Sequence, residues 1–190
     1  RPPPRWGGSG VGRPPADAGR PASVAPRPDR AAAAAFWLSE TPDRPSVGWD
    51  GDCPRVATWV DLELDGRPLR LLSVHLDHAG AEARRKGALA VATHVAALDR
   101  PAIVVGDCNA APDSAAMDWL TTAGLRLASD VAGSVDGPTG TFHGFTGTPG
   151  EHIDHVLVTD AFEVEAVRTV ATDAPHPSDH FPVVADLRWS

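Results

Sequence analysis

The sequence predicts one domain that mixes strands and helices, of the α/β or α+β class. Three observations predict it: alternating apolar residues at 55–64, an apolar run at 102–105, and apolar residues at helical spacing within 81–98. The chain has 190 residues, of which 42% are hydrophobic, and this is enough for one domain with a substantial core.

The first 34 residues are dominated by Pro, Gly, Arg and Ala and show no periodicity. Such a segment buries too little apolar surface to offset its ordering entropy. We therefore expect it to be weakly structured, with at most a short edge strand at 22–25. The domain itself is expected over residues 35–190, opening with a strand at 35–39, although the alanines at 31–35 are also compatible with a helix.

A hairpin is expected next. A loop at 41–54 precedes a strand at 55–64, Asp65-Gly66 favours a tight turn, and residues 69–76 return as a more buried strand. The alternation at 55–64 indicates a half-buried strand with one apolar face, formed by Val56, Thr58, Val60, Leu62 and Leu64.

The longest helix is predicted at 81–98. Its first turns carry three consecutive basic residues, Arg84, Arg85 and Lys86, which is unfavourable for the helix dipole. These charges are either simply solvated or form a basic rim beside a phosphate site, and solvated charge is the slightly favoured interpretation.

The remaining elements alternate between strands and a short helix. Gly106 ends the buried strand at 102–105, and Ser114 is expected to cap a helix at 115–123 that Gly124 closes. Residues 131–140 and 172–180 are predicted to be loops. Strands are predicted at 152–159, 162–170 and 181–187.

Composition narrows the classes of function. The net charge of −8 argues against broad, sequence-independent binding of nucleic acid, which needs a basic face, but it leaves room for a nuclease whose site is made positive by a metal. The two cysteines do not make a disulfide framework, and Cys108 is expected to be a small buried residue. No apolar run has the length of a membrane span, and no signal peptide is visible.

Polar residues gather at strand ends. Asp107 and Asn109 follow the buried strand at 102–105, two residues apart and therefore on the same side; on their own they fit either a functional site or an ordinary Asx-turn. Four such clusters occur, at 75–78, 106–109, 153–155 and 178–180. Together their His, Asp and Asn side chains are the residue set of metal-assisted phosphoryl chemistry, with Mg²⁺ or Mn²⁺ as the hard cation.

These motifs carry a family resemblance. The matching stretches are Phe-Trp-Leu-Ser-Glu-Thr-Pro at 36–42, Ser-Val-His-Leu-Asp-His at 73–78, Gly-Asp-Cys-Asn at 106–109, Thr-Phe-His-Gly-Phe at 141–145, Ile-Asp-His-Val at 153–156 and Pro-Ser-Asp-His-Phe-Pro at 177–182. From residue 36 to 189 the chain resembles the endonuclease/exonuclease/phosphatase superfamily, the DNase I-like enzymes. The resemblance implies an α+β fold, a four-layer α/β/β/α sandwich of two mostly antiparallel sheets. It also implies a divalent-metal-dependent phosphoesterase, a hydrolase of phosphodiesters or phosphomonoesters.

The resemblance also implies residue roles. Asp107 would orient or deprotonate the attacking water, Asn109 would hold that water or a phosphate oxygen, and both would lie at the metal, with Asp179 as a further metal ligand. Whether Asp107 or His180 is the formal base stays open.

The two histidines of the implied site would act on the phosphate. His180 would contact the scissile phosphate while Asp154 fixes its tautomer, and His75 would hydrogen-bond the phosphate and stabilise charge in the transition state.

Other polar residues have structural explanations as well. Asp77 and His78 can cap the following helix, His143 can pack between aromatic neighbours, and His155 should point away from Asp154, because neighbours on a strand face opposite sides.

The chain departs from the family pattern at its start. The family opens with a strand bearing an Asn and a second strand ending in Gln-Glu, whose Glu is the main metal ligand, and neither is found here. We expect weakened Mg²⁺ binding and an incomplete sheet edge. A fragment of a longer product, a shortened start and a degenerate paralogue are three explanations, and the first residue, Arg rather than Met, favours the first two.

Two rival functions follow. One is a catalytically inactive DNase I-like domain that acts as a binding module; the other, a calcineurin-like phosphatase, is set aside because the Asp-x-His and Gly-Asn-His patterns are not found. The expected partner is a phosphate-ester substrate, with nucleic acid not favoured by the net charge, and the expected state is a monomer. Localisation stays open: a cytoplasmic location fits the visible chain, and an upstream signal peptide would make the protein secreted.

Overall fold

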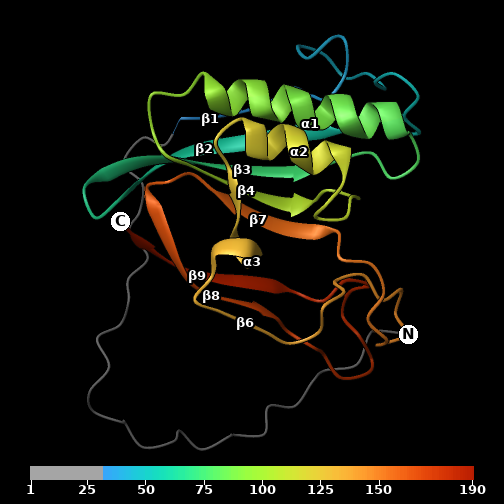
Figure 1. The fold of residues 1–190 in the computed structure, drawn as a ribbon. Coiled ribbons are helices and arrows are strands. Elements are labelled where there is room, and N and C mark those ends of the chain that lie inside the picture. Colours follow the sequence, from blue (N-terminus) through green and yellow to red (C-terminus); the bar gives the residue numbers. More distant parts are fainter. Residues whose placement is uncertain (1–31) are drawn as a thin grey trace, which may run out of the picture.

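The computed structural model describes residues 32–190, so the edge strand expected at 22–25 lies outside the described residues (Figure 1). The described part contains three helices, α1 (Ala81–Ala96), α2 (Ala115–Thr122) and α3 (Ala128–Val131). Its strands are β1 (Ala33–Trp37), β2 (Val56–Leu64), β3 (Arg67–His75), β4 (Ala102–Asp107), β5 (Arg126–Leu127), β6 (Ser134–Asp136), β7 (Asp154–Val158), β8 (Phe162–Thr169) and β9 (Val183–Trp189). None of the helices in residues 32–190 is long and apolar enough to cross a membrane.

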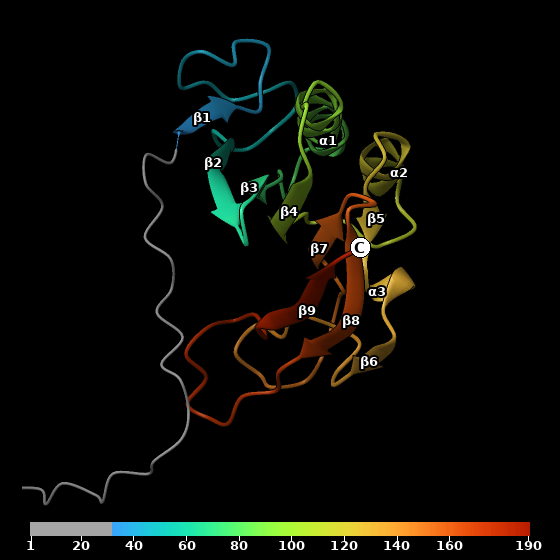
Figure 2. The same ribbon diagram turned by 90° about the vertical axis from the view of Figure 1, so that its left-hand side faces the viewer.

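The strands form two mixed sheets, of which the larger is mostly antiparallel and the smaller has one parallel and one antiparallel pair. The larger has the order β1-β2-β3-β4-β7-β5 and the smaller β6-β8-β9. Only β3 with β4 and β6 with β8 pair in parallel within the described chain. Figure 2 shows the smaller sheet beneath the larger one, with α1 and α2 on the opposite side of the larger sheet. The predicted α+β fold with two facing sheets is confirmed.

Two cores hold these layers together. One lies between α1, α2 and the larger sheet and includes Leu72, Val91, Val104, Met117 and Leu157. The other lies between the sheets and includes Leu69, Val158, Phe162, Val164 and Val167. Burying each large apolar side chain contributes about 1.5–3 kcal/mol. Within residues 32–190 no helix covers the outer face of the smaller sheet, so this part of the chain supplies three of the four expected layers.

Residues on both faces of β2 pack against a core, not on one face only as its alternation indicated, although Thr58, Glu63 and Leu64 are exposed. Ala57 is fully buried and Trp59 packs against the helix-side core, whereas Leu62 packs against the core between the sheets. The reason is its place in the sandwich: helices lie on one side of the sheet and a second sheet on the other. Alternation of polar and apolar residues therefore misjudged which face is solvated.

Two other predictions are corrected. The segment expected as a loop at 131–140 contains β6, which pairs in parallel with β8 over Ser134–Asp136. All three β6 residues are exposed, so no apolar pattern marks the strand. The first strand, β1, begins and ends two residues earlier than the predicted 35–39.

Candidate active site

Three neighbouring strands bring polar side chains to one edge of the larger sheet. In the register of the parallel β3–β4 pair, His75 lies opposite Asp107, and in the antiparallel β4–β7 pair Asp107 lies opposite Asp154. His180 reaches the same edge from the loop before β9, where its backbone pairs with Phe142 and its ring packs edge-on against the Phe142 ring at 5.1 Å. Residues more than a hundred positions apart thus meet at one place.

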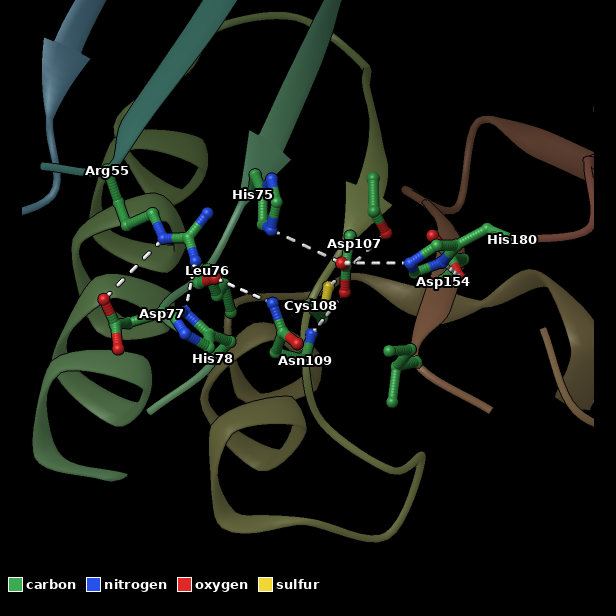
Figure 3. A network of polar contacts seen from close by, with 12 residues as sticks. Arg55, His75, Leu76, Asp77, His78, Asp107, Cys108, Asn109, Asp154 and His180 are labelled. Carbon is green, nitrogen blue, oxygen red and sulfur yellow. Dashed lines mark hydrogen bonds and ion pairs between the residues drawn. The ribbon is translucent and has the colours of Figure 1, made fainter. Parts of the chain in front are cut away.

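Asp107 is the centre of this group (Figure 3). Its Oδ2 lies 3.4 Å from Nε2 of His75 and 3.9 Å from Nε2 of His180. The Nδ1 of His180 donates to Oδ2 of Asp154 at 2.7 Å. The side chains of Asp107 and Asp154 are only 16% and 21% exposed, so both carboxylates act in a partly desolvated environment where electrostatic interactions are stronger than in bulk water.

The loop after β4 forms an Asx-turn at the candidate site, so this turn is compatible with the functional interpretation, which stays a prediction. The backbone N–H of Asn109 donates to Oδ1 of Asp107 at 2.8 Å, which leaves Oδ2 directed at the histidines. The Asn109 Nδ2 donates to the Leu76 carbonyl oxygen at 3.0 Å and ties this loop to the one after β3. Asn109 adopts φ 45°, a left-handed conformation that Asn tolerates better than most residues.

Gly106 makes this edge of the sheet sterically feasible. Its φ is 143°, and a Cβ built there would collide with the carbonyl oxygen of Val74 on the adjacent strand. A glycine is therefore required where β4 approaches β3, one residue before Asp107. The strand does not end at Gly106, as predicted, but continues through it to Asp107.

The pKa values of His180 and His75 are shifted in opposite directions. Partial burial would lower the pKa of His180, but the hydrogen bond and charge of Asp154, together with the charge of Asp107, outweigh it and raise the pKa above 6.5. Desolvation and the nearby positive charge of Arg55 lower the pKa of His75 against the opposing pull of Asp107. His180 is therefore the better proton donor of the two, and His75 is neutral at pH 7.

The family model for the endonuclease/exonuclease/phosphatase family matches residues 16–180. The chain belongs to the endonuclease/exonuclease/phosphatase family. This confirms the resemblance that the motifs indicated. A comparison with curated proteins gave no match.

Solved structures of this family agree. An endonuclease/exonuclease/phosphatase from Bacteroides vulgatus is 35% identical with a TM-score of 0.79, over 84% of this chain and 65% of that chain. The mannosyl-6-phosphatase of Bacteroides thetaiotaomicron VPI-5482 is 30% identical with a TM-score of 0.76, over 83% of this chain and 66% of that one. The catalytic domain of human Nocturnin shares the fold. It is 18% identical with a TM-score of 0.60, over 84% of this chain and 59% of that chain. The chain thus spans just under two thirds of the length of the two bacterial structures.

The donor atoms of the site suit a hard divalent cation. One ligand atom each from Asp107, Asp154 and His180 lie within 4.8 Å of one another. Carboxylate oxygens are the ligands that Mg²⁺ and Mn²⁺ prefer, and the amide oxygen of Asn109 is of the same type. Asp179 is not part of this group of three, and its role as a metal ligand stays a prediction.

Asp77 is a structural residue. Its carboxylate is almost fully buried and accepts three backbone hydrogen bonds, from Asp52, Ala79 and Gly80. It does not cap α1, however. The free N–H groups of the first helical turn donate instead to Asp50, from Glu82 at 3.2 Å and Ala83 at 2.7 Å.

Two further expectations concern buried histidines. His155 is buried on the side away from Asp154 and donates from Nε2 to the Ala110 carbonyl at 2.8 Å, which anchors the loop that carries Asn109. His143 is buried, but it stacks on Phe181 at 4.1 Å instead of packing between Phe142 and Phe145.

Two more expectations concern Cys108 and Ser114. Cys108 is fully buried, and burial raises the pKa of its thiol to about 12, so it is an inert core residue. Ser114 occupies the N-cap position of α2 as predicted, but it makes no side-chain capping bond.

No pattern in the sequence assigned a site role to Arg55, which lies beside His75 at the candidate site. Its Nη2 donates to Nδ1 of His78 at 2.7 Å, and its Nε lies 3.6 Å from Oδ2 of Asp77. Figure 3 shows the guanidinium joined by dashed lines to both of these residues, on the side of them toward His75. The pairing of the strands could have identified this residue. Arg55 immediately precedes β2, and because β2 runs antiparallel to β3, Arg55 must lie near the end of β3 that carries His75.

Proposed function

We propose that this chain carries the active site of a metal-dependent hydrolase that acts on phosphate monoesters. The observation that supports it best is Asp107, flanked on both sides by imidazole nitrogens at 3.4 and 3.9 Å and located among carboxylates that suit a divalent cation. Family membership supports hydrolysis of a phosphoester bond. The monoester follows from the mannosyl-6-phosphatase that is similar to this chain.

Asp107 and His180 divide the proton chemistry. Asp107 takes or orients the proton of the attacking water through Oδ2, because its Oδ1 is already occupied by the Asn109 N–H. His180 holds its Nδ1 proton on Asp154, so Nε2 is the atom that faces the substrate. The raised pKa of His180 favours a proton on Nε2, which can donate a hydrogen bond to a phosphate oxygen as negative charge develops there.

His75 and Asn109 orient the phosphate. Neutral His75 places Nε2 3.4 Å from Oδ2 of Asp107, and its single N–H is there to donate to a phosphate oxygen. The Asn109 side chain is fixed by the Leu76 carbonyl, so its oxygen is available to a cation or to the water. A bound Mg²⁺ or Mn²⁺, held by Asp107 and Asn109 with Asp179 as the further candidate, supplies Lewis-acid stabilisation of the phosphoryl oxygens.

A small substrate fits the charge of this protein better than a polyanion. The net charge of −8 repels a long nucleic acid at a distance, whereas a single phosphate group meets only the local site. We therefore place sugar phosphates and similar monoesters ahead of polynucleotides as substrates.

The proposal is tested with two chromogenic esters, one a phosphate monoester and the other a diester. We expect the purified chain to hydrolyse 4-nitrophenyl phosphate faster than bis(4-nitrophenyl) phosphate in Mg²⁺ or Mn²⁺, and EDTA to stop both reactions. Preference for the diester would contradict the monoester assignment. No turnover by protein that circular dichroism shows to be folded would favour the catalytically inactive binding module.

A further inference from the structure

Arg55 is a partly buried cation at the edge of the sheet that carries the candidate active site. Its side chain is 14% exposed, and that of its partner Asp77 is 2% exposed. Burying a guanidinium costs free energy unless its charge and hydrogen bonds are used, so its environment should show what occupies each nitrogen.

Two corners of the guanidinium are held in place. Nη2 donates to Nδ1 of His78 at 2.7 Å, and because Arg can only donate, His78 must carry its proton on Nε2, which lies 3.7 Å from Oδ2 of Asp52. Nε is buried and makes no hydrogen bond, but it lies 3.6 Å from Oδ2 of Asp77 in an ion pair, and that carboxylate is itself fixed by three backbone N–H groups. The guanidinium is therefore oriented before any ligand arrives.

The third corner is free. Nη1 makes no hydrogen bond within residues 32–190, and it is not among the fully buried atoms that lack a partner, so it keeps contact with solvent. In Figure 3 this corner of the guanidinium is directed toward the side where His75 lies.

We propose that Arg55 is a phosphate-binding residue of this site, with Nη1 donating to a non-bridging oxygen of the substrate and with His78 and Asp77 as its positioning residues. The inference rests on the proposed function and deepens it. Arg55, His75 and His180 then provide three nitrogen donors at the end of the sheet that carries Asp107, with the two histidine nitrogens 3.4 and 3.9 Å from its Oδ2. A phosphate monoester has three non-bridging oxygens to receive them, whereas a diester has two.

Inorganic phosphate is the probe that tests this, with calorimetric titration of the full chain in Mg²⁺. We expect Arg55→Met to weaken phosphate binding about tenfold or more, the size of one lost charge-assisted hydrogen bond. Arg55→Lys should give an intermediate loss of at least about threefold, because Lys keeps the charge but not the fork that reaches both His78 and the phosphate.

A matched control is Arg70→Met. Arg70 is similarly buried, at 12% side-chain exposure, and pairs with Asp61 at 2.7 Å. It lies five residues before His75 on β3, roughly 16 Å away at about 3.3 Å per residue. Its loss should lower the melting temperature but leave the affinity for phosphate unchanged.

Two results overturn the inference: no phosphate binding by the unmodified chain, or phosphate affinity in folded Arg55→Met within twofold of the unmodified chain. If Arg55→Met does not fold, Arg55→Lys is used instead. A phosphate affinity of Arg55→Lys equal to that of the unmodified chain then overturns the inference. Turnover separates this inference from the proposed function. If phosphate binding depends on Arg55 but no ester is hydrolysed, the inference holds and the proposed function is wrong. If Arg55→Met hydrolyses esters as well as the unmodified chain, the proposed function holds and the inference is wrong.

A substrate comparison adds a readout that a purely structural role would not change. Replacement of Arg55 by Met should raise the KM for 4-nitrophenyl phosphate more than that for bis(4-nitrophenyl) phosphate, because only the monoester has the third non-bridging oxygen. Equal effects on both esters contradict the assignment of Arg55 to that oxygen.

Discussion

His180 and Asp154 are joined by a 2.7 Å hydrogen bond that connects the two halves of the sandwich. Asp154 begins β7 of the larger sheet, and His180 lies in the loop that enters β9 of the smaller sheet. The geometry of the candidate active site therefore depends on the packing of one sheet against the other, which the core around Phe162 and Val164 maintains.

Asp154→Asn should impair turnover without unfolding the protein. The amide cannot fix the His180 tautomer as the carboxylate does, and a comparable change in a Ser-His-Asp triad lowers kcat by about 10⁴-fold. We expect a loss of kcat on the order of a hundredfold or more, with a small change in melting temperature. Asp160→Asn, at an exposed position just beyond β7, is the matched control, and near-normal kcat in Asp154→Asn would refute the role of the pair.

The His180 proton should be retained to higher pH than that of an ordinary histidine. Burial opposes protonation, but Asp154, with Asp107 and Asp179, raises the pKa above 6.5. A raised folded-state pKa means that this group's contribution to stability is complete below about pH 6.5 and is lost as pH rises through the folded pKa. Titration of His180 by NMR should show this, with a lower pKa in Asp154→Asn; an unchanged pKa would contradict it.

Gly106→Ala should destabilise the fold strongly. The new Cβ would meet the Val74 carbonyl oxygen, and the φ of 143° is unfavourable for any side chain. We expect a loss of at least about 2 kcal/mol in the free energy of unfolding, measured by urea denaturation. Gly66→Ala is the control for backbone strain alone, because its φ is 74° and no atom lies within 4 Å of its added Cβ. Similar losses in the two variants would argue against the steric explanation.

Asp77→Asn should weaken the fold more than its conservative size suggests. The carboxylate accepts backbone hydrogen bonds from Asp52, Ala79 and Gly80 and faces Arg55. Hydrogen bonds to a charged acceptor contribute about 1.5–3 kcal/mol each, and we expect a net loss of about 2–4 kcal/mol in urea denaturation. As a control, Asp43→Asn at an exposed position should change the free energy of unfolding by less than about 0.5 kcal/mol. A small effect at Asp77 would mean that the loop is held by other contacts.

Local patterns predicted the elements that local interactions determine. The hairpin of β2 and β3 turns at Asp65-Gly66, and α1 was predicted from its apolar stripe, with the observed helix ending two residues earlier than expected. In contrast, β6 was missed, because its three exposed residues are a strand only by virtue of pairing with β8, some thirty residues later.

In the candidate site, too, residues in local motifs were predicted and residues with distant partners were not. His75, Asp107 and Asp154 were chosen from motifs at strand ends, and the register of β3, β4 and β7 places them side by side. Arg55 was given no site role and Asp50 was not predicted as the helix cap, since their partners lie 22 to 33 residues away and no local pattern identifies such contacts. The chemical roles of all these residues stay predictions.

The central claim is that Asp107 and its histidines form a phosphate-ester hydrolysis site. Release of 4-nitrophenol from 4-nitrophenyl phosphate in Mg²⁺, by the unmodified chain and by Asp107→Ala, tests it most directly. We predict EDTA-sensitive turnover by the former and a loss of at least about 10³-fold in kcat/KM in the latter, since Asp107 is placed to act both on the water and on the metal. Turnover that Asp107→Ala retains in full would contradict the account.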